Sequence, residues 1–467
     1  MRLLLRNIKI VMIVFALISV GLLGGILIQQ YRAQRDLRVA AGENKAILRS
    51  RYASAGTIFS ADGVALAHSS EGRRLYAADA TLAQSLSQLV GDYTHNIHNT
   101  IEAQYQGQLT GTERNPFSQL LFDVTGRGLA GDDITLTIDS RLQLAAWNLL
   151  GDYRGAIVLI DYHLGAIRAM VSKPATSPEN IINYENIPDT ALFNRALMGR
   201  YAPGSSFKFV TAAAFMRSPV WNPDHLVFCS GSEPLVPNGV REHGEGHGEI
   251  NMTRAFQVSC NHFYGNIALA AGYEKLRETA EGFAFNRPLM VDRLDASGGR
   301  ISSDPFDQAL LSWLGIGQPL GESVLQVSPL QLAMMAGAVG NGGVMMEPHI
   351  VEHQTNPLDQ EYQTLVPRER ATVLDPETNR RVRELMLAGI DGGTGELAAV
   401  PGYAVGGKTG TAEVEGQERP NAVFLAFLDS PAHPFAVGIV CENAGYASGI
   451  AAPMASELFR LAIQLRG

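Results

Sequence analysis

The first strong pattern in the chain is an uninterrupted apolar run near its amino terminus. Residues 10–28 carry no charged side chain and are mostly aliphatic. At a rise of about 1.5 Å per residue, a helix of this length crosses most of a bilayer's hydrocarbon core. A buried helix of a soluble protein would show a polar face, and a cleaved signal peptide would have a shorter apolar region and a small-residue cleavage site. The pattern therefore predicts an uncleaved transmembrane signal-anchor over residues 10–28, behind a short tail of residues 1–9.

The chain that follows the apolar run is polar at first and then carries short strand-like patterns. Residues 29–50 are polar and charged with an alanine-rich stretch, and they predict a helical stalk. Within residues 51–130, two short apolar runs flank a turn at Asp62-Gly63, which is typical of a small module with strands. We therefore expect residues 29–130 to form a stalk and a small pedestal domain.

From residue 131 onward the pattern indicates a larger domain of the α+β class. Strand patterns occur near both ends of residues 131–467, and helical spacing dominates between them from about residue 190 to 390. A sheet assembled from both ends of a domain, with helices inserted between, gives an α+β or α/β arrangement. The elements predicted at the two ends are a strand over 134–138, a helix over 141–150, a hairpin over 156–171, strands over 403–414, 421–429 and 435–441, and a final helix over 452–465.

Composition narrows the classes of function. The 467 residues are 46% hydrophobic and 18% charged, which describes a folded protein. The formal net charge of −9 and the lack of a basic stripe argue against a nucleic-acid partner. Cys229, Cys260 and Cys441 are too few for a disulfide framework, and no C-x-x-C pair or metal-ligand spacing occurs, so no metal site is expected. The sequence leaves open a bridge between Cys229 and Cys441.

The first candidate motif places a serine and a lysine at the start of a predicted helix. Ser205 follows Pro203-Gly204, which break the preceding chain, and Lys208 lies three residues further on the same helix face. A serine hydroxyl becomes a good nucleophile when a base takes its proton. A lysine can be that base if burial and a second cation lower its pKa from about 10.4 toward 7. Alone, the motif is more typical of a capping serine beside a solvated lysine than of a catalytic pair.

The second candidate motif is Ser259-Cys260-Asn261. The hydroxyl of Ser259 could relay a proton between the base and a leaving amine. The amide of Asn261 offers both a donor and an acceptor, which suits the recognition of a substrate amide. Alone, this pattern is less specific than the first motif, because a turn or a helix start forms it easily.

The third candidate motif lies on a predicted strand that is rich in glycine. One ammonium and two hydroxyls along it would make a good receptor for a carboxylate, and the glycines would let the backbone of a substrate peptide approach and add as a further strand. An ordinary glycine-rich edge strand would show the same pattern. The residues of the motif are Lys408, Thr409, Gly410 and Thr411.

The three motifs together are much more specific than any one of them. S-x-x-K, S-x-N and K-T-G each occur once, in this order, and such a set is a signature of penicillin-binding proteins and β-lactamases. The sequence resembles the class B transpeptidases among the penicillin-binding proteins, and within them the compact PbpA-type branch. The resemblance extends over about residues 51–465. It includes the stretches Leu136-Thr137-Ile138-Asp139, Gly315-Ile316-Gly317-Gln318 and Gly393-Thr394-Gly395.

The resemblance implies a fold and a role for each motif residue. The fold would be a central antiparallel sheet flanked by helices, with the pedestal and one transmembrane helix before it. The activity would be a serine-type D,D-transpeptidase that cross-links peptidoglycan stem peptides through an acyl-enzyme and releases the terminal D-alanine. The implied roles are Ser205 as nucleophile, Lys208 as its base, Ser259 as proton relay, Asn261 as holder of the substrate amide, Lys408, Thr409, Gly410 and Thr411 as the carboxylate-binding strand, and the backbone N–H groups of Ser205 and Thr411 as the oxyanion hole.

The resemblance also implies partners and a location. β-Lactam antibiotics would acylate the same serine, and no metal or organic cofactor is implied. The substrate lies outside the cytoplasmic membrane of a bacterium, so the amino terminus would be cytoplasmic and the catalytic domain extracytoplasmic. Such an enzyme would work beside a multi-span glycan polymerase of the shape, elongation, division and sporulation family.

Other functions share much of this chemistry. A D,D-carboxypeptidase or a β-lactamase would use the same first half-reaction and send water to the acyl-enzyme. A largely non-catalytic activator of a glycan polymerase also remains open, although an intact Ser205/Lys208 pair argues against a purely structural role. A bifunctional enzyme with its own glycosyltransferase is not expected, because only about 100 residues lie between the apolar run and residue 131.

Overall fold

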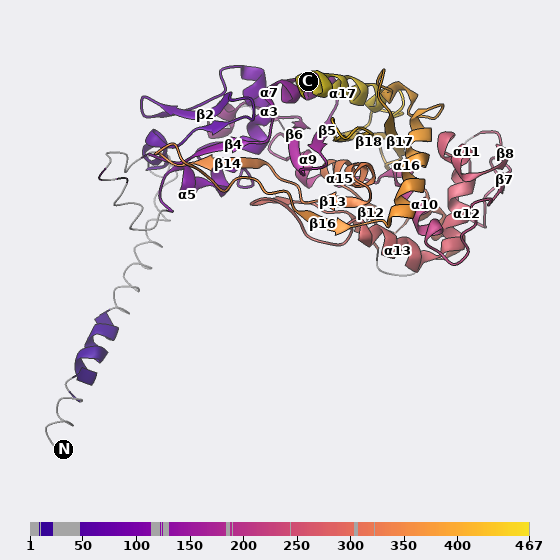
Figure 1. The fold of residues 1–467 in the computed structure, drawn as a ribbon, viewed down its shortest axis with the longest axis horizontal. Coiled ribbons are helices and arrows are strands. Elements are labelled where there is room, and N and C mark those ends of the chain that lie inside the picture. The colour runs from indigo at the N-terminus through magenta and orange to yellow at the C-terminus, as the bar shows by residue number, and fades with distance from the viewer. Residues whose placement is uncertain are drawn as a thin grey trace.

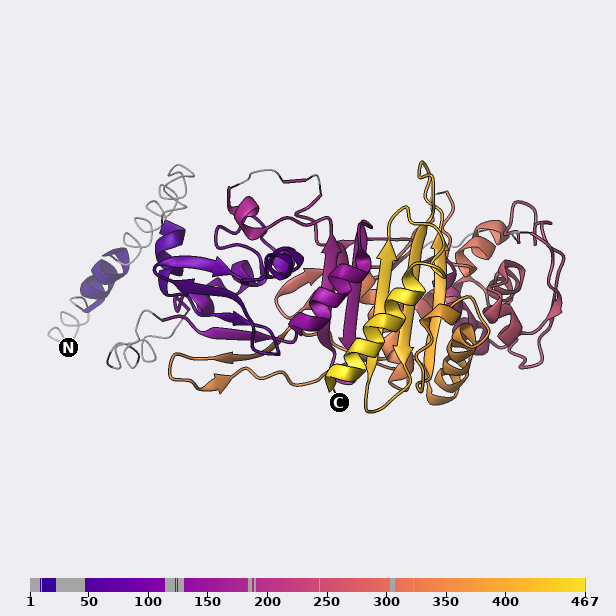
Figure 2. The same ribbon diagram turned by 90° about the horizontal axis from the view of Figure 1, so that it is seen from above.

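The structure is a computed structural model. It describes residues 9, 11–21, 47–113, 122, 124, 130–183, 187–188, 190–242, 244–302, 307–321 and 323–466. Two views show an elongated body with one sheet at the end nearer the amino terminus, a second sheet in the middle, and a group of helices at the far end (Figures 1 and 2).

The sheet nearer the amino terminus is built from three distant segments of the chain. Its strand order is β15-β14-β4-β1-β2-β3. β1 runs parallel to β4, while β14 pairs antiparallel with β4 on its other side. The domain boundary expected between residues 130 and 131 would assign β4 to the larger domain, whereas β4 belongs to the same sheet as β1, β2 and β3. The strands are β1 (Ile58–Phe59), β2 (Ala65–Ser70), β3 (Arg73–Tyr76), β4 (Asp133–Leu136), β14 (Val351–Thr355) and β15 (Glu361–Tyr362), and the helices that accompany them are α3 (Ala80–Val90), α4 (Ile101–Gln104) and α5 (Gln106–Leu109).

The central sheet has five antiparallel strands in the order β17-β18-β19-β5-β6. Every residue of β5, β18 and β19 is buried, because helices cover both faces of the sheet, and these strands are accordingly continuous apolar runs. The predicted hairpin and the three predicted carboxyl-terminal strands are confirmed. The strands are β5 (Gly155–Asp161), β6 (Ala166–Lys173), β17 (Val405–Ala412), β18 (Asn421–Leu428) and β19 (Phe435–Cys441).

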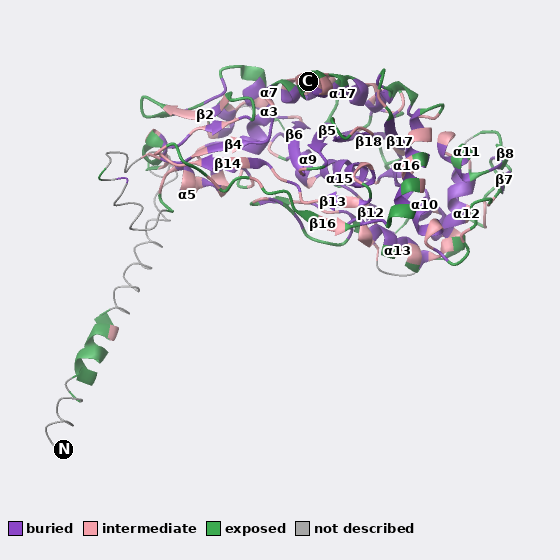
Figure 3. Ribbon diagram, viewed as in Figure 1, coloured by how far each residue is buried: buried purple, intermediate pink, exposed green. Residues whose placement is uncertain are grey.

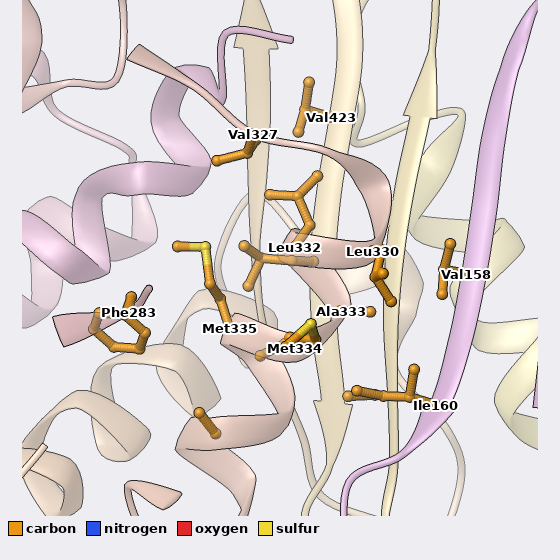
Figure 4. Close-up of a cluster of buried hydrophobic side chains, with 14 of the residues drawn as sticks. Val158, Ile160, Phe283, Val327, Leu330, Leu332, Ala333, Met334, Met335 and Val423 are labelled. Carbon is orange, nitrogen blue, oxygen red and sulfur yellow. The ribbon is translucent and has the colours of Figure 1, made fainter. Parts of the chain in front are cut away.

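Helix α15 (Pro329–Gly340) covers one face of the central sheet. Ser328 caps its amino end by accepting from the Gln331 N–H, and Pro329 stands in the first turn, where no N–H is needed. All but its last residue are buried, which explains why it is apolar on every side. Figure 4 shows its side chains packed against strand residues such as Val158, and Figure 3 shows the same buried layer through the body.

Helices α7 (Ser140–Leu150) and α17 (Ala451–Arg466) cover the opposite face. Alternate strand residues such as Ile157 and Phe424 point to this side and form a second apolar cluster with the two helices. Both helices were predicted from the sequence, and both are confirmed.

Helices dominate the rest of the chain, as predicted, but short two-stranded pairs interrupt them. The hairpin of β14 and β15 was not expected within this largely helical stretch. The remaining elements are η1 (Tyr52–Ser54), α8 (Pro178–Asn183), α9 (Arg195–Met198), η2 (Gly204–Phe207), α10 (Lys208–Met216), β7 (Val227–Cys229), β8 (Gly248–Ile250), α11 (Met252–Gln257), α12 (Asn261–Ala271), α13 (Tyr273–Gly282), β9 (Leu289–Val291), β10 (Leu294–Ala296), β11 (Arg300–Ile301), α14 (Gln308–Gly315), β12 (Leu325–Gln326), β13 (Val344–Met346), β16 (Glu369–Thr372), α16 (Pro376–Ile390) and η3 (Glu396–Ala398).

The predicted anchor and stalk lie only partly within the described residues. Residues 11–21 of the anchor are helical, whereas residue 10 and residues 22–28 lie outside the description, as do residues 29–46 of the stalk. Among the described residues, no helix combines the length and the apolar character needed to cross a membrane. Elsewhere, Cys229, Cys260 and Cys441 are buried free thiols, so the bridge that the sequence left open is not formed.

Candidate active site

Ser205 lies in a tight turn that leads into a buried helix. The 3-10 turn η2 runs directly into α10, and Gly204 holds a positive φ of 55° at its start. A Cβ atom on Gly204 would lie only 2.5 Å from the carbonyl oxygen of Thr411, so only glycine lets the turn approach β17 this closely. The Ser205 side chain is half-buried, and its hydroxyl makes no hydrogen bond to any described residue. It is therefore available to attack a bound group.

Lys208 is fully buried one helical turn beyond Ser205. Its ammonium donates to the Ser259 carbonyl oxygen at 2.6 Å, to the Asn261 Oδ1 at 2.8 Å and to the Ser259 Oγ at 3.2 Å. Removal from water disfavours the charged form and lowers the pKa of Lys208 to about 8, against the opposing effect of Glu242. The side chain can therefore exist in the neutral form that a base requires.

Ser259 connects the two lysines of the motifs. It stands between α11 and α12 with a left-handed φ of 58°, which a serine seldom adopts. Its Oγ lies 3.2 Å from the Lys208 Nζ and 2.9 Å from the Lys408 Nζ. Two donors occupy both lone pairs of this oxygen, so its own proton points away from the lysines. The geometry suits a hydroxyl that passes a proton onward.

Asn261 holds the turn that carries Ser259. Its Oδ1 accepts from Lys208, its Nδ2 donates to the Arg241 carbonyl oxygen at 3.1 Å, and its backbone N–H donates to the Glu242 carboxylate at 2.7 Å. The acceptor end of the amide is thus used within the protein, and one N–H of the Nδ2 remains beyond the bond to Arg241.

Lys408 is buried on β17, the edge strand of the central sheet. Besides Ser259, its ammonium reaches the Thr409 carbonyl oxygen at 3.2 Å and the Thr394 Oγ1 at 3.4 Å. Burial, and then the neighbouring charge of Lys208, lowers the pKa of Lys408 well below its ordinary value. The sequence predicted that burial and a second cation would both lower the pKa of Lys208; burial does so, whereas the repulsion between the two cations lowers the pKa of Lys408. A single positive charge shared around Ser259 is the favoured state of the pair.

The glycines of β17 serve contacts within the protein. A Cβ on Gly410 would lie 2.3 Å from the Pro203 carbonyl oxygen, and one on Gly406 would lie 2.5 Å from the ring of Phe427. The sequence predicted that the backbone of a substrate would approach these glycines. The backbone that approaches at Gly410 is instead that of the nucleophile turn. β17 remains an edge strand, so its outer side can still accept an added strand.

The structure brings the eight candidate residues together, because hydrogen bonds connect both lysines and Asn261 to the Ser259 turn, and the nucleophile turn packs against the β17 strand that carries the other motif residues. Two further contributors were not identified from the sequence. Thr394 shares a 2.6 Å hydrogen bond with the Thr409 hydroxyl, and Glu242 anchors the backbone of Asn261. The Gly393-Thr394-Gly395 stretch was a signal for Thr394, since glycines on both sides of a threonine mark a close approach. Glu242 gave no signal in the sequence.

The family assignment follows from a match over most of the chain. Residues 155–460 match the family model of the penicillin-binding protein transpeptidase domain. The chain belongs to the penicillin-binding protein transpeptidase family. Its relatives place it in class B of these proteins.

Among the relatives of this family member is the peptidoglycan D,D-transpeptidase PbpA of Mycobacterium tuberculosis (strain ATCC 25618 / H37Rv). The two are 27% identical over 98% of this chain and 99% of PbpA. The peptidoglycan D,D-transpeptidase MrdA of Acinetobacter baumannii is 26% identical over 77% of this chain and 59% of MrdA.

Solved structures show the same transpeptidase fold. The crystal structure of PBPA from M. tuberculosis superimposes with a TM-score of 0.78 at 25% identity and covers 88% of this chain and 99% of that one. The D,D-transpeptidase domain of a peptidoglycan glycosyltransferase from Eggerthella lenta gives a TM-score of 0.76 at 28% identity, covering 88% and 99% of the two chains. The α+β assignment made from the sequence is therefore confirmed.

Proposed function

We propose that the chain is a peptidoglycan D,D-transpeptidase that acts through a serine acyl-enzyme. The observation that carries this proposal is the Ser259 hydroxyl, held between two buried lysines beside a serine with an unbonded hydroxyl. The relatives named peptidoglycan D,D-transpeptidase support the substrate class. The penicillin G acyl-enzyme complex of penicillin-binding protein A from M. tuberculosis, 25% identical, supports acylation by β-lactams.

In the first half-reaction, the Ser205 Oγ attacks the carbonyl carbon of the penultimate D-alanine. Neutral Lys208 takes the hydroxyl proton, and the backbone N–H groups of Ser205 and Thr411 stabilise the oxyanion. The bond to the terminal D-alanine then breaks, and its nitrogen receives a proton by way of Ser259. The products are free D-alanine and an ester between the stem peptide and Ser205.

In the second half-reaction, an amine of another stem peptide attacks this ester. The amine gives up a proton to the same base, a peptide bond forms, and the Ser205 Oγ leaves with a proton returned from Lys208. The amide of Asn261 orients the substrate through its remaining N–H.

The carboxylate of the substrate has a further effect on the lysine pair. It binds at Lys408, Thr409 and Thr411, where its negative charge favours the protonated form of Lys408. Since the pair favours a single positive charge, the proton then resides on Lys408 and leaves Lys208 neutral. Substrate binding thus prepares the base.

The test is to incubate the full-length protein, purified in detergent, with a stem pentapeptide and an amine acceptor. A dimer that forms with release of D-alanine supports the transpeptidase, whereas a tetrapeptide without dimer indicates the carboxypeptidase or hydrolase alternative. Intact-mass measurement after exposure to penicillin should show one adduct in the wild type and none in Ser205→Ala. An unchanged adduct in that variant would contradict the role of Ser205.

The remaining sequence expectations are proposals about the setting of the enzyme. Residues 1–9 form a cytoplasmic tail, residues 10–28 a single membrane anchor, residues 29–130 a stalk and pedestal, and residues 131–467 an extracytoplasmic catalytic domain. The support is the uncharged apolar run. Reporter fusions at both termini test it, because a carboxyl-terminal alkaline phosphatase fusion is active only outside the cytoplasm.

A glycan polymerase partner of the shape, elongation, division and sporulation family belongs to the same proposal. The support is the family membership. The purified protein by itself should not extend lipid-linked disaccharide, and polymerisation by the chain alone would contradict the proposal.

A further inference from the structure

A second cluster of reactive side chains lies behind the Ser259 turn and takes no part in the proposed reaction. Cys229 ends β7, Glu242 and His247 lie between β7 and β8, and Cys260 caps the amino end of α12. One potential ligand atom of each residue lies within 4.8 Å of those of the other three. Figure 1 places β7, β8 and α12 together at the end of the body far from the amino terminus.

We propose that these four side chains bind one divalent transition-metal ion, for which zinc is the best match. Two sulfurs, one imidazole nitrogen and one carboxylate oxygen form a four-ligand set of the kind zinc prefers. Ligand atoms at about 2.0–2.3 Å from a tetrahedral ion are roughly 3.3–3.8 Å apart. The Cys229 Sγ lies 3.4 Å from the His247 Nδ1, and that nitrogen lies 3.8 Å from the Glu242 carboxylate. The soft sulfur ligands disfavour calcium and magnesium.

The loop that carries His247 folds back on itself, which brings the imidazole of His247 next to the Cys229 sulfur. Cys229 on β7 pairs with Gly248 on β8, and Gly248 is the residue that directly follows His247. A Cβ on Gly246 would lie 2.3 Å from the Cys229 carbonyl oxygen, and one on Gly231 would lie 2.8 Å from the Gly246 backbone nitrogen. The tight packing of these two glycines fixes the loop beside both buried sulfurs, so the ligands converge from four separate parts of the local fold.

A metal bound by these four side chains would hold the Ser259–Asn261 turn in place without touching the substrate. Cys260 stands between Ser259 and Asn261, and the Glu242 carboxylate accepts the backbone N–H of Asn261 at 2.7 Å. Two ligands are therefore connected directly to the segment that holds the hydroxyl between the lysines. The metal site itself does not depend on the proposed function, because it can be tested by metal content alone.

The main alternative is a disulfide between Cys229 and Cys260, which an oxidising compartment would allow. A disulfide would use the two sulfurs only and would leave the convergence of Glu242 and His247 without a reason. The two states differ in measurable ways. A metal site keeps all three cysteines as thiols once the metal is removed, whereas a disulfide leaves one thiol, on Cys441.

The experiment uses the full-length protein, purified in detergent without chelators and analysed by elemental mass spectrometry. We expect about one zinc per chain in the wild type, and at least tenfold less in Cys229→Ser and His247→Ala after the same dialysis. His247 is exposed on its loop, so His247→Ala should fold normally. Cys441→Ala, which removes a buried thiol on β19 of the central sheet, is the matched control and should keep its zinc.

Cobalt supplies a second readout after the zinc has been removed by a chelator. Added Co²⁺ should give a thiolate-to-cobalt absorption band that saturates at one equivalent in the wild type and in Cys441→Ala. In Cys229→Ser the band should be weaker and require at least tenfold more cobalt. Added zinc should raise the melting temperature of the wild type and leave that of His247→Ala unchanged, since a ligand that binds the folded state stabilises it.

Several results would overturn the proposal. One is a wild-type protein that carries no zinc and gives no cobalt band. Another is one titratable thiol per unfolded, chelated chain, which would identify the disulfide. A third is equal zinc binding by the wild type and His247→Ala.

Discussion

At the scale of single residues, Lys208 and Lys408 have different roles, although both are buried. Lys208 must lose its proton to act as a base, and an arginine cannot do so in a protein. Lys408 needs only to present a cation to a carboxylate, which an arginine also does. The difference separates a chemical role from an electrostatic one.

We therefore predict that Lys208→Arg nearly abolishes acylation, with a loss of at least about a thousandfold, roughly 4 kcal/mol of barrier. Lys408→Arg should retain measurable activity, limited by the longer side chain on a buried strand, while Lys408→Ala should be much worse. The measurement is the second-order rate of acylation by a fluorescent penicillin, with folding checked by thermal melting. If Lys208→Arg reacts as fast as Lys408→Arg, another group must be the base.

The pKa of Lys208 gives a second prediction at this scale. Burial lowers the pKa of Lys208 to about 8, and the base is the neutral form. Below about pH 8 the free pair carries one proton, which moves to Lys408 when the carboxylate binds, so the acylation rate of the free enzyme should be level below pH 8 and fall about tenfold per pH unit above it. Stopped-flow acylation between pH 6 and 9.5 measures the profile. A rate that rises through pH 8 would contradict the proton transfer from Lys208 to Lys408.

The same scale shows what the sequence could and could not predict. Ser205, Lys208 and Lys408 were identifiable because their chemistry depends on residue types at short, fixed spacings. Thr394 and Glu242 were not assigned roles, because each acts through contacts between segments that the sequence does not align. The expectation of no metal site rested on the spacing of residues along the sequence. Spacing could not reveal the cluster, because Cys229 and Cys260 come together only in the folded chain.

At the scale of elements, the contact between the nucleophile turn and β17 decides the geometry of the site. A Cβ on Gly410 would meet the Pro203 carbonyl oxygen at 2.3 Å, which no real Cβ contact allows. Gly410→Ala should push β17 away from the turn and lower the acylation rate by at least about tenfold. Gly449→Ala, where a Cβ meets nothing within 4 Å, should acylate like the wild type. Equal rates for the two variants would contradict the close approach.

The elements of the central sheet were largely predictable, because β18 and β19 are continuous apolar runs and α17 has helical periodicity. The hairpin of β14 and β15 was not. Its strand β14 pairs with β4, which lies more than 200 residues earlier, and local patterns carry no information about so distant a partner.

At the scale of the whole molecule, a buried ion pair holds the amino-terminal sheet together. The Arg74 Nε donates to the Glu102 carboxylate at 2.8 Å with both side chains fully buried, and Arg74 also donates to the Gly56 carbonyl oxygen at 2.7 Å. Removal of one partner from such a pair leaves an uncompensated buried charge.

Glu102→Ala should accordingly lower the free energy of unfolding of this part of the molecule by about 3–5 kcal/mol. Chemical denaturation followed by hydrogen exchange measures the loss in β1 to β3. Glu384→Ala, which breaks the exposed pair with Arg380, should change stability by less than about 1 kcal/mol and serves as the control. A similar small effect in Glu102→Ala would show that the pair contributes little.

The origin of the amino-terminal sheet in three distant segments also has a consequence for the time course of biogenesis. A ribosome adds about 5–20 residues per second, so β14 emerges roughly 10–40 s after β4. During that interval the edge of β4 has no neighbour and resembles the exposed strands from which aggregates grow. Newly made chains should therefore depend on a holding chaperone during this interval, and a version truncated before residue 351 should accumulate in an insoluble form.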